Sequence, residues 1–180
     1  PGAPEGPAAA PTVGAPPRTA IGLSMGANTI SANGVQLLRR SRPHFGWAVG
    51  AGLGSSWLRY GAQGRFYLLP LVSSPYFGLD VHANSGKVAT DQPRHDSEGN
   101  ETGGTFGYTT EFSVLLGLSA GWHLVWDHFF VDPAIGWSVL AAGGNFFTDA
   151  APGTLSDYDL EQARGDRGGP QLGVTAGITW

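Results

Sequence analysis

The feature that most constrains this chain is a period-two alternation of large apolar residues with small or polar ones. It is clearest in the stretch PQLGVTAGITW, residues 170–180. Successive side chains of a strand point to opposite faces, so one face of this stretch is apolar and the other carries Gln, Gly and Thr. The apolar face holds Leu172, Val174, Ala176, Ile178 and Trp180. The stretch predicts a strand with one apolar face that finishes on an aromatic residue.

The same alternation recurs along the chain and predicts eight antiparallel strands. They fall in residues 19–28, 35–40, 45–54, 58–68, 77–84, 106–126, 129–142 and 171–180. Asn33-Gly34, in a turn expected over residues 31–34, is a strong hairpin signal. Pro133 cannot donate to a ladder, which predicts a break or bulge in its strand. The polar stretches 85–105 and 143–169 are expected to be long loops, with at most one helical turn between residues 154 and 164.

The first part of the chain differs from the rest in composition. Residues 1–18 consist almost entirely of Pro, Ala and Gly, which favours an extended, partly polyproline II segment. We interpret it as a periplasmic N-terminal extension that serves as a spacer or as a docking segment. Residues 19–180 are then one β-barrel domain.

Side-chain size indicates which face of the barrel points inward. The lumen of an eight-stranded barrel is just wide enough for side chains to fill, so it cannot hold many large rings. The apolar face carries ten of them: Phe45, Trp47, Tyr60, Phe66, Phe77, Phe112, Trp122, Phe129, Trp137 and Trp180. The other face is mostly Gly, Ala, Ser and Thr, and the whole chain has a single Lys. An apolar exterior around a polar interior is typical of a transmembrane barrel, whereas a soluble barrel has the reverse polarity.

The lengths of the connections agree with a membrane barrel. With an even number of strands, both ends of the barrel sequence lie on one side, where the connections are short. The two long polar connections, residues 85–105 and 143–169, both fall on the opposite side. We therefore predict an all-β fold: an eight-stranded antiparallel up-and-down transmembrane β-barrel.

At this point the chain resembles the small eight-stranded outer-membrane barrels of the OmpA, OmpX and opacity-protein type. The resemblance rests on the strand pattern, on FFVDPAIGWSV at residues 129–139 and on GVTAGITW at residues 173–180. It implies a location in the bacterial outer membrane, contact with membrane lipid and lipopolysaccharide, and insertion by the barrel-insertion machinery. Ile178 and Trp180 are the expected C-terminal insertion signal.

Charged residues on the inward face are the first candidates for a functional site. Burial of unpaired charges is costly, so we expect them to pair. The predicted lumen charge network consists of Arg59, Arg65, Asp80, His82, Glu111, His123 and Asp132. This network is interpreted as a salt-bridged plug, with a narrow polar or ion-conducting path as the alternative. Aromatic girdles at the two membrane interfaces are predicted to include Trp57, Tyr60, Trp122 and Trp126.

Other chemistry has weaker support in the sequence. Ser119 with His123, or Asp80 with His82, suggests a hydrolase, but no Ser-His-acid constellation can be placed. A metal site is suggested by the loop residues His95, Asp96, Glu98 and Glu101, together with His82. The second loop is acidic and could bind a calcium ion through Asp149, Asp157, Asp159, Glu161 and Asp166. Solvated side chains are the default reading of both. We predict no catalytic, cofactor-binding or metal site. A net charge of −4 without a basic run argues against nucleic acid.

The leading functional hypothesis is a non-enzymatic structural or anchoring subunit of the cell envelope. It would bind a larger envelope complex through its outer loops or its N-terminal segment. The alternatives are a narrow pore, a lipid-modifying outer-membrane enzyme and, last, a soluble ligand-binding barrel.

Overall fold

A computed structural model of the chain describes residues 18–54, 57–151, 153–164 and 168–180. The predictions for the N-terminal segment, which ends at residue 18, therefore concern mostly residues outside the described ranges. Only Arg18 is described there, and it begins a strand.

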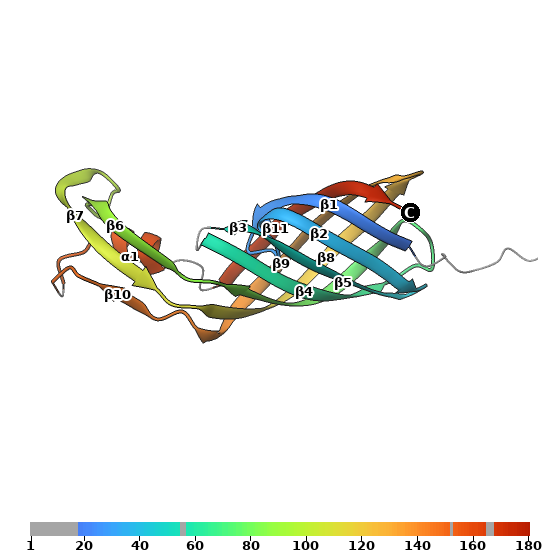
Figure 1. Cartoon of the computed structure of the whole chain (residues 1–180), viewed down its shortest axis with the longest axis horizontal. Coiled ribbons are helices and arrows are strands. Elements are labelled where there is room, and N and C mark those ends of the chain that lie inside the picture. The colour runs from blue at the N-terminus through green and yellow to red at the C-terminus, as the bar shows by residue number, and fades with distance from the viewer. Residues whose placement is uncertain (1–17, 55–56, 152, 165–167) are drawn as a thin grey trace, which may run out of the picture.

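Eight strands form a closed antiparallel barrel, as the alternation predicts. The order around the barrel is β1-β11-β9-β8-β5-β4-β3-β2, so consecutive barrel strands are neighbours and β11 closes onto β1 (Figure 1). The strands are β1 (Arg18–Ala27), β2 (Asn33–Arg42), β3 (Phe45–Gly54), β4 (Trp57–Tyr67), β5 (Ser74–Asn84), β8 (Ser113–Trp126), β9 (Phe129–Gly143) and β11 (Gly168–Thr179). Closure leaves no barrel strand with a free edge.

The side chains of the barrel alternate as expected. All ten large rings assigned to the outward face are exposed, and so are aliphatic residues such as Leu23, at 71% exposure, and Leu118, at 67%. The inward positions are buried and mostly polar. Three rings do lie inside, namely Tyr67, Tyr76 and Phe130, each at 2% exposure or less. The inward face was expected to be mostly small residues with a few charged ones, so Tyr76 and Phe130 are a correction, whereas Tyr67 has the inward parity of β4.

The predicted loops are partly regular structure, which is a second correction. Residues 85–105 contain β6 (Lys87–His95) and the start of β7 (Glu101–Thr110), and residues 143–169 contain β10 (Phe146–Thr148) and α1 (Asp157–Arg164). The predicted strand 106–126 is two strands, β7 and β8, separated at residues 111–112. The chain leaves β5 through Gly86, whose φ of 84° is a conformation that glycine adopts without strain.

These elements form a second sheet, which we call the extension. Its strand order is β10-β7-β6, and it projects from one end of the barrel (Figure 1). Its small core contains Ala89, Phe106 and Tyr108, against which Phe146 and Leu155 pack. The eight residues of α1 exceed the single helical turn expected from the sequence. No helix among the described residues is long and apolar enough to cross a membrane.

We name the two ends of the barrel for what they carry. The extension end also carries the β1–β2 connection, residues 28–32. The turn end carries the short connections 43–44, 68–73 and 127–128. The β1–β2 connection does not turn at Asn33-Gly34, which already belong to β2. It folds into the lumen, where Ile30 and Ser31 are buried. Gly50 leaves room for it, since a Cβ there would lie 2.8 Å from the Cβ of Ser31.

Pro133 interrupts a ladder, but it causes no bulge. On one side it lies opposite Val174 in a continuous β9–β11 register. On the other side, the β8–β9 pairing stops at Gly121 with Ala134 and resumes at Leu124 with Val131, in the same register. The missing N–H of proline therefore costs pairing locally without bending the barrel wall.

Candidate functional site in the barrel lumen

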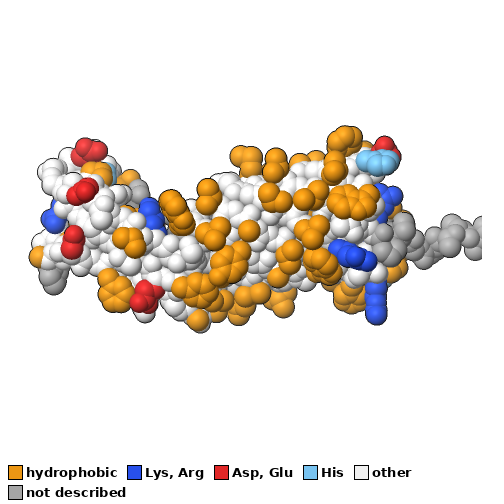
Figure 2. Space-filling model, viewed as in Figure 1, with side chains coloured by type: hydrophobic (Ala, Val, Ile, Leu, Met, Phe, Trp, Pro, Cys, Tyr) orange, Lys and Arg blue, Asp and Glu red, His pale blue; other side chains and the backbone are white. Residues whose placement is uncertain are grey.

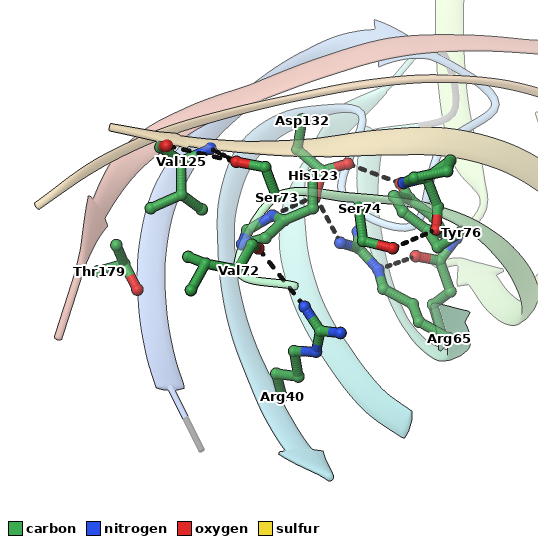
Figure 3. A network of polar contacts seen from close by, with 12 residues as sticks. Arg40, Arg65, Val72, Ser73, Ser74, Tyr76, His123, Val125, Asp132 and Thr179 are labelled. Atoms are coloured by element: carbon green, nitrogen blue, oxygen red, sulfur yellow. Dashed lines mark hydrogen bonds and ion pairs between the residues drawn. The ribbon is translucent and has the colours of Figure 1, made fainter. Parts of the chain in front are cut away.

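The centre of the lumen is an ion pair between opposite parts of the wall. Arg65 lies on β4 and Asp132 on β9, and Arg65 Nη1 lies 2.6 Å from Asp132 Oδ2. The Tyr76 hydroxyl donates to Asp132 Oδ1 at 2.6 Å, and His123 Nδ1 lies 3.0 Å from Oδ2 (Figure 3). Both side chains of the ion pair are at most 4% exposed. Asp132 is thus fully engaged, as a buried carboxylate must be.

Gln63 extends this network along β4. Its Oε1 accepts from Arg65 Nε at 2.6 Å, and its Nε2 donates to Ser119 Oγ at 2.9 Å. The guanidinium carbon of Arg65 lies 4.4 Å from the ring centre of Tyr76, a cation–π contact. Four wall strands, β4, β5, β8 and β9, are therefore joined through one arginine and its partners. Such a network holds the lumen filled and fixes the side chains inside it.

A second group lies nearer the extension end. His82 Nδ1 is 2.9 Å from Asp80 Oδ1, and Gln171 Nε2 donates to the same oxygen at 3.2 Å. Arg59 Nε donates to Asn84 Oδ1 at 2.7 Å, and Asn84 donates in turn to Ser113 at 3.2 Å. Here too each charged side chain has a polar partner. The described part of the lumen thus contains two sets of polar contacts and no open, charged channel wall.

Arg40 closes the lumen at the turn end. Its guanidinium donates to the carbonyl oxygens of Pro43, Leu69, Leu71 and Val72. It also lies 4.3 Å from the ring centre of Tyr67. Arg40 thereby holds the two turns 43–44 and 68–73 over the barrel mouth.

The structure places six of the seven predicted network residues in the lumen. Arg65, His123 and Asp132 meet directly, whereas Asp80 pairs with His82 and Arg59 with Asn84. The placement of Glu111 is wrong. Glu111 is exposed and accepts from Asn145 Nδ2 at 2.8 Å. The break at residues 111–112 interrupts the alternation, so parity carried through it from β8 assigns Glu111 to the wrong face.

Sequence reasoning missed three members of the network, Gln63, Tyr67 and Tyr76. The signal for two of them was present, because Gln63 and Tyr67 share the inward parity of Arg65 on β4. Tyr76 falls between the predicted strands 58–68 and 77–84, so the alternation assigned it to neither face. A buried guanidinium needs acceptors and ring faces around it, and that need could have pointed to these neighbours.

The space left between the lumen side chains is small, although a pocket of about 560 Å³ opens at the extension end beside Asn33, Leu53 and Arg59. A cavity of about 30 Å³ is lined by Thr29 and Gln36, among others, and one of about 10 Å³ lies near Arg40 and Tyr67. Thr29 Oγ1 and Gln36 Oε1 are buried without a partner, so the larger cavity is polar. It has room for about two water molecules. The lumen is thus nearly filled by side chains.

The arrangement does not build the hydrolase triad considered from the sequence. Ser119 Oγ accepts from Gln63, and His123 is directed at Asp132. Asp80 and His82 do pair, and His82 Nε2 is left without a partner, but the dyad is almost completely buried. A substrate has no access to it.

Two of the loop residues that suggested metal binding, His95 and Asp96, have other partners. His95 on β6 pairs with Asp159 of α1, with Nδ1 3.0 Å from Oδ1. Asp96 Oδ1 accepts from the backbone amides of Glu98 and Asn100, which lower the pKa of Asp96, Asn100 most strongly. No group of three or more His, Asp and Glu side chains suited to a metal ion occurs in the described part of the chain.

The other predicted site residues lie on the outside. Trp57 and Tyr60 are exposed near the extension end of β4, and Trp122 and Trp126 are exposed near the turn end of β8. Ile178 and the C-terminal Trp180 are exposed as well. The four girdle candidates thus divide between the two ends of the barrel wall.

No protein-family model matches the chain, and no curated protein matches it. The geometry of the barrel and the extension therefore supports the proposed function below.

Proposed function

We propose that this chain is a non-enzymatic integral β-barrel of the bacterial outer membrane, of the OmpA, OmpX and opacity-protein type. In this role it is a structural or anchoring subunit of the cell envelope. The observation that carries the proposal is the polarity of the barrel. Its wall exposes a belt of large apolar side chains (Figure 2), while Arg59, Arg65, Asp80 and Asp132 are buried in the lumen.

Energetics support a lipid surrounding for this wall. A soluble monomer rarely exposes a contiguous apolar patch larger than a few hundred Å². Here more than twenty large hydrophobic side chains of the barrel are over one third exposed. In lipid this belt is favourable, and the closed ladder leaves no unpaired strand edge in the hydrocarbon.

The anchoring role is supported by the division of the molecule into two parts. The filled lumen suits a rigid support better than a pore. The extension reaches beyond the end of the apolar belt and presents two sheet edges, β6 and β10, to its surroundings. In the proposed orientation the extension faces outward, and a partner in a larger envelope complex would bind there.

Substitution of one outward residue tests this proposal. Leu118→Arg, on β8 in the apolar belt, should reduce the free energy of unfolding in lipid vesicles by about 2–4 kcal/mol, because the charge enters the hydrocarbon. The matched control is Val88→Arg on the exposed face of the extension, which should leave it unchanged. A soluble barrel would tolerate both substitutions equally, and failure of the wild-type chain to float with vesicles would refute the proposal. Stepwise conductance in a planar bilayer would instead support the pore.

A further inference from the structure

The two ends of the molecule carry opposite charges. At the turn end, the exposed or half-exposed cations are Arg18, Arg39 and Arg42, and Asp127 is the acidic side chain among the described turn residues. The charged residues that the extension exposes are instead mostly acidic, among them Glu98, Glu101 and Asp157. Figure 2 shows this separation, with Lys and Arg side chains clustered at the turn end and most Asp and Glu side chains on the extension.

Arg39 and Arg42 lie on one sector of the barrel wall, and Arg18 lies beside it, opposite Arg40, at the start of β1. Arg39 and Arg42 are on β2, and Arg18 is on the neighbouring β1, where Thr19 lies opposite Arg39. Arg39 belongs to the outward face, opposite Trp47 of β3, and Arg42 lies opposite Phe45. The sector therefore combines two exposed guanidinium groups with two exposed aromatic rings at the edge of the apolar belt.

The described part of the chain places no carboxylate in an ion pair with these guanidinium groups. Among the described residues, no ion pair involves Arg39 or Arg42, and Arg18 donates only to the Asp127 carbonyl oxygen, at 3.4 Å. The carboxylate of Asp127 pairs with His128 at 2.7 Å. Arg40, by contrast, is buried and donates its hydrogen bonds to carbonyl oxygens of the turns 43–44 and 68–73. The sector thus has cations in excess of nearby anions.

We propose that this sector is a binding site for the phosphate groups of anionic phospholipids, such as phosphatidylglycerol, in the leaflet at the turn end. The inference rests on the proposed membrane location. Guanidinium groups bind phosphate oxygens through paired N–H donors. Tryptophan beside them is favoured at the headgroup level of a bilayer. Arg39 reaches the headgroups from the outward face, and Arg42 lies at the last residue of β2.

Lipid enrichment measures this binding. The protein is extracted from vesicles of equal phosphatidylglycerol and phosphatidylcholine, and the lipids that stay bound are quantified by native mass spectrometry. One arginine near an anionic surface raises the affinity for anionic lipid about fivefold. Arg39 and Arg42 together should therefore enrich phosphatidylglycerol roughly 25-fold. The double variant Arg39→Gln/Arg42→Gln should lose it. The control Lys87→Gln/Arg94→Gln, which removes two charges from β6, should keep it.

Each outcome decides the matter. Loss in the β2 double variant together with retention in the β6 control supports the site. Enrichment that survives in the β2 variant, falls equally in both variants, or is absent from the wild type overturns the site while leaving the membrane location intact. If the wild type does not insert into vesicles of either lipid, the proposed function fails first. Displacement of bound lipid by inorganic phosphate would show an anion site without lipid selectivity and would also overturn the inference.

Discussion

The barrel and the extension are antiparallel sheets with opposite polarity. In the barrel the buried face carries Arg65, Asp132 and their polar partners, and the exposed face is apolar. In the extension the buried face is apolar, with Phe106 and Tyr108 in its core, and acidic side chains are exposed. Strand β5 leads into β6, and β7 leads into β8, so one chain changes polarity within a few residues. In the proposed membrane location, this polarity places lipid around the barrel and water around the extension.

The barrel and the extension also differ in the contacts that hold each sheet together. The barrel has no free strand edge and is joined internally by ion pairs, so it should unfold as one unit. The extension is open at two edges and depends on a few side chains and on one helix. We therefore expect the two parts to lose structure separately, and the following predictions test that expectation.

Loss of the central carboxylate should have the largest effect. Asp132→Ala leaves the Arg65 guanidinium buried without its counter-ion and deprives Tyr76 and His123 of their acceptor. The free energy of unfolding of the barrel should fall by about 3–5 kcal/mol, measured by urea titration in lipid vesicles. Glu111→Ala is the control, because Glu111 is exposed, and it should change the value by less than about 0.5 kcal/mol. Equal effects of the two variants would contradict the described lumen.

Emptying the core of the extension should be the next largest change. Phe106 is 5% exposed, so Phe106→Ala should cost the extension about 3 kcal/mol of local stability. Limited proteolysis should then cut within residues 87–110 while barrel unfolding stays as in the wild type. Val88→Ala, at an exposed position, provides the comparison. A matching loss of barrel stability would show that the two parts unfold together.

The contact between α1 and β6 should have a smaller, local effect. Asp159 accepts from the backbone amide of His95 at 3.1 Å and bonds its ring, and Asp159 is 2% exposed. Asp159→Ala should weaken the docking of α1 by about 1–2 kcal/mol, because buried donors lose their acceptor. Hydrogen exchange should accelerate at the His95 amide and in α1, but not in β8. Asp157→Ala, at the exposed start of α1, should cause a much weaker acceleration.

The smallest effect expected is a pH dependence of the β6–β7 turn. Hydrogen bonds from Asn100 and Glu98 lower the pKa of Asp96 below its ordinary 3.8. Because the folded pKa is lower than the unfolded one, the turn is stabilised above the ordinary pKa, and this stability is lost as the pH falls through the lowered value. An NMR titration of the turn amides should follow this loss. Asp96→Asn should remove the pH dependence, and an unchanged titration in that variant would disprove the assignment.

Much of the barrel could be predicted from the sequence, and the extension could not. The alternation of side chains between two faces is a local property of a strand. The eight strands and the outward direction of rings such as Trp47 and Trp137 therefore follow from the local sequence pattern. The extension strands lack that regularity. β6 contains Pro93 and β7 contains Gly103 and Gly104, and the β6–β7 pairing contains two register irregularities. Their composition is that of a loop, and only pairing with β10 and packing against α1 makes them a sheet.

The site divides in the same way. Parity alone assigns Arg65 and Asp132 to the lumen, but not to each other. Which charges meet depends on strand register and on distance across the barrel, and these place Arg65 of β4 against Asp132 of β9, 67 residues away in sequence. Glu111 shows where parity fails, because it lies at a break that the alternation does not reveal.

The sequence by itself determined that strands with one apolar face close into a small barrel, and that the ten rings on that face are too many to fit inside. That conclusion needs only side-chain alternation and side-chain volume. The tertiary structure alone decided the partners of the buried charges, the inward fold of residues 28–32 and the existence of the extension. These depend on contacts between segments far apart in the chain, whose free energies no local pattern encodes.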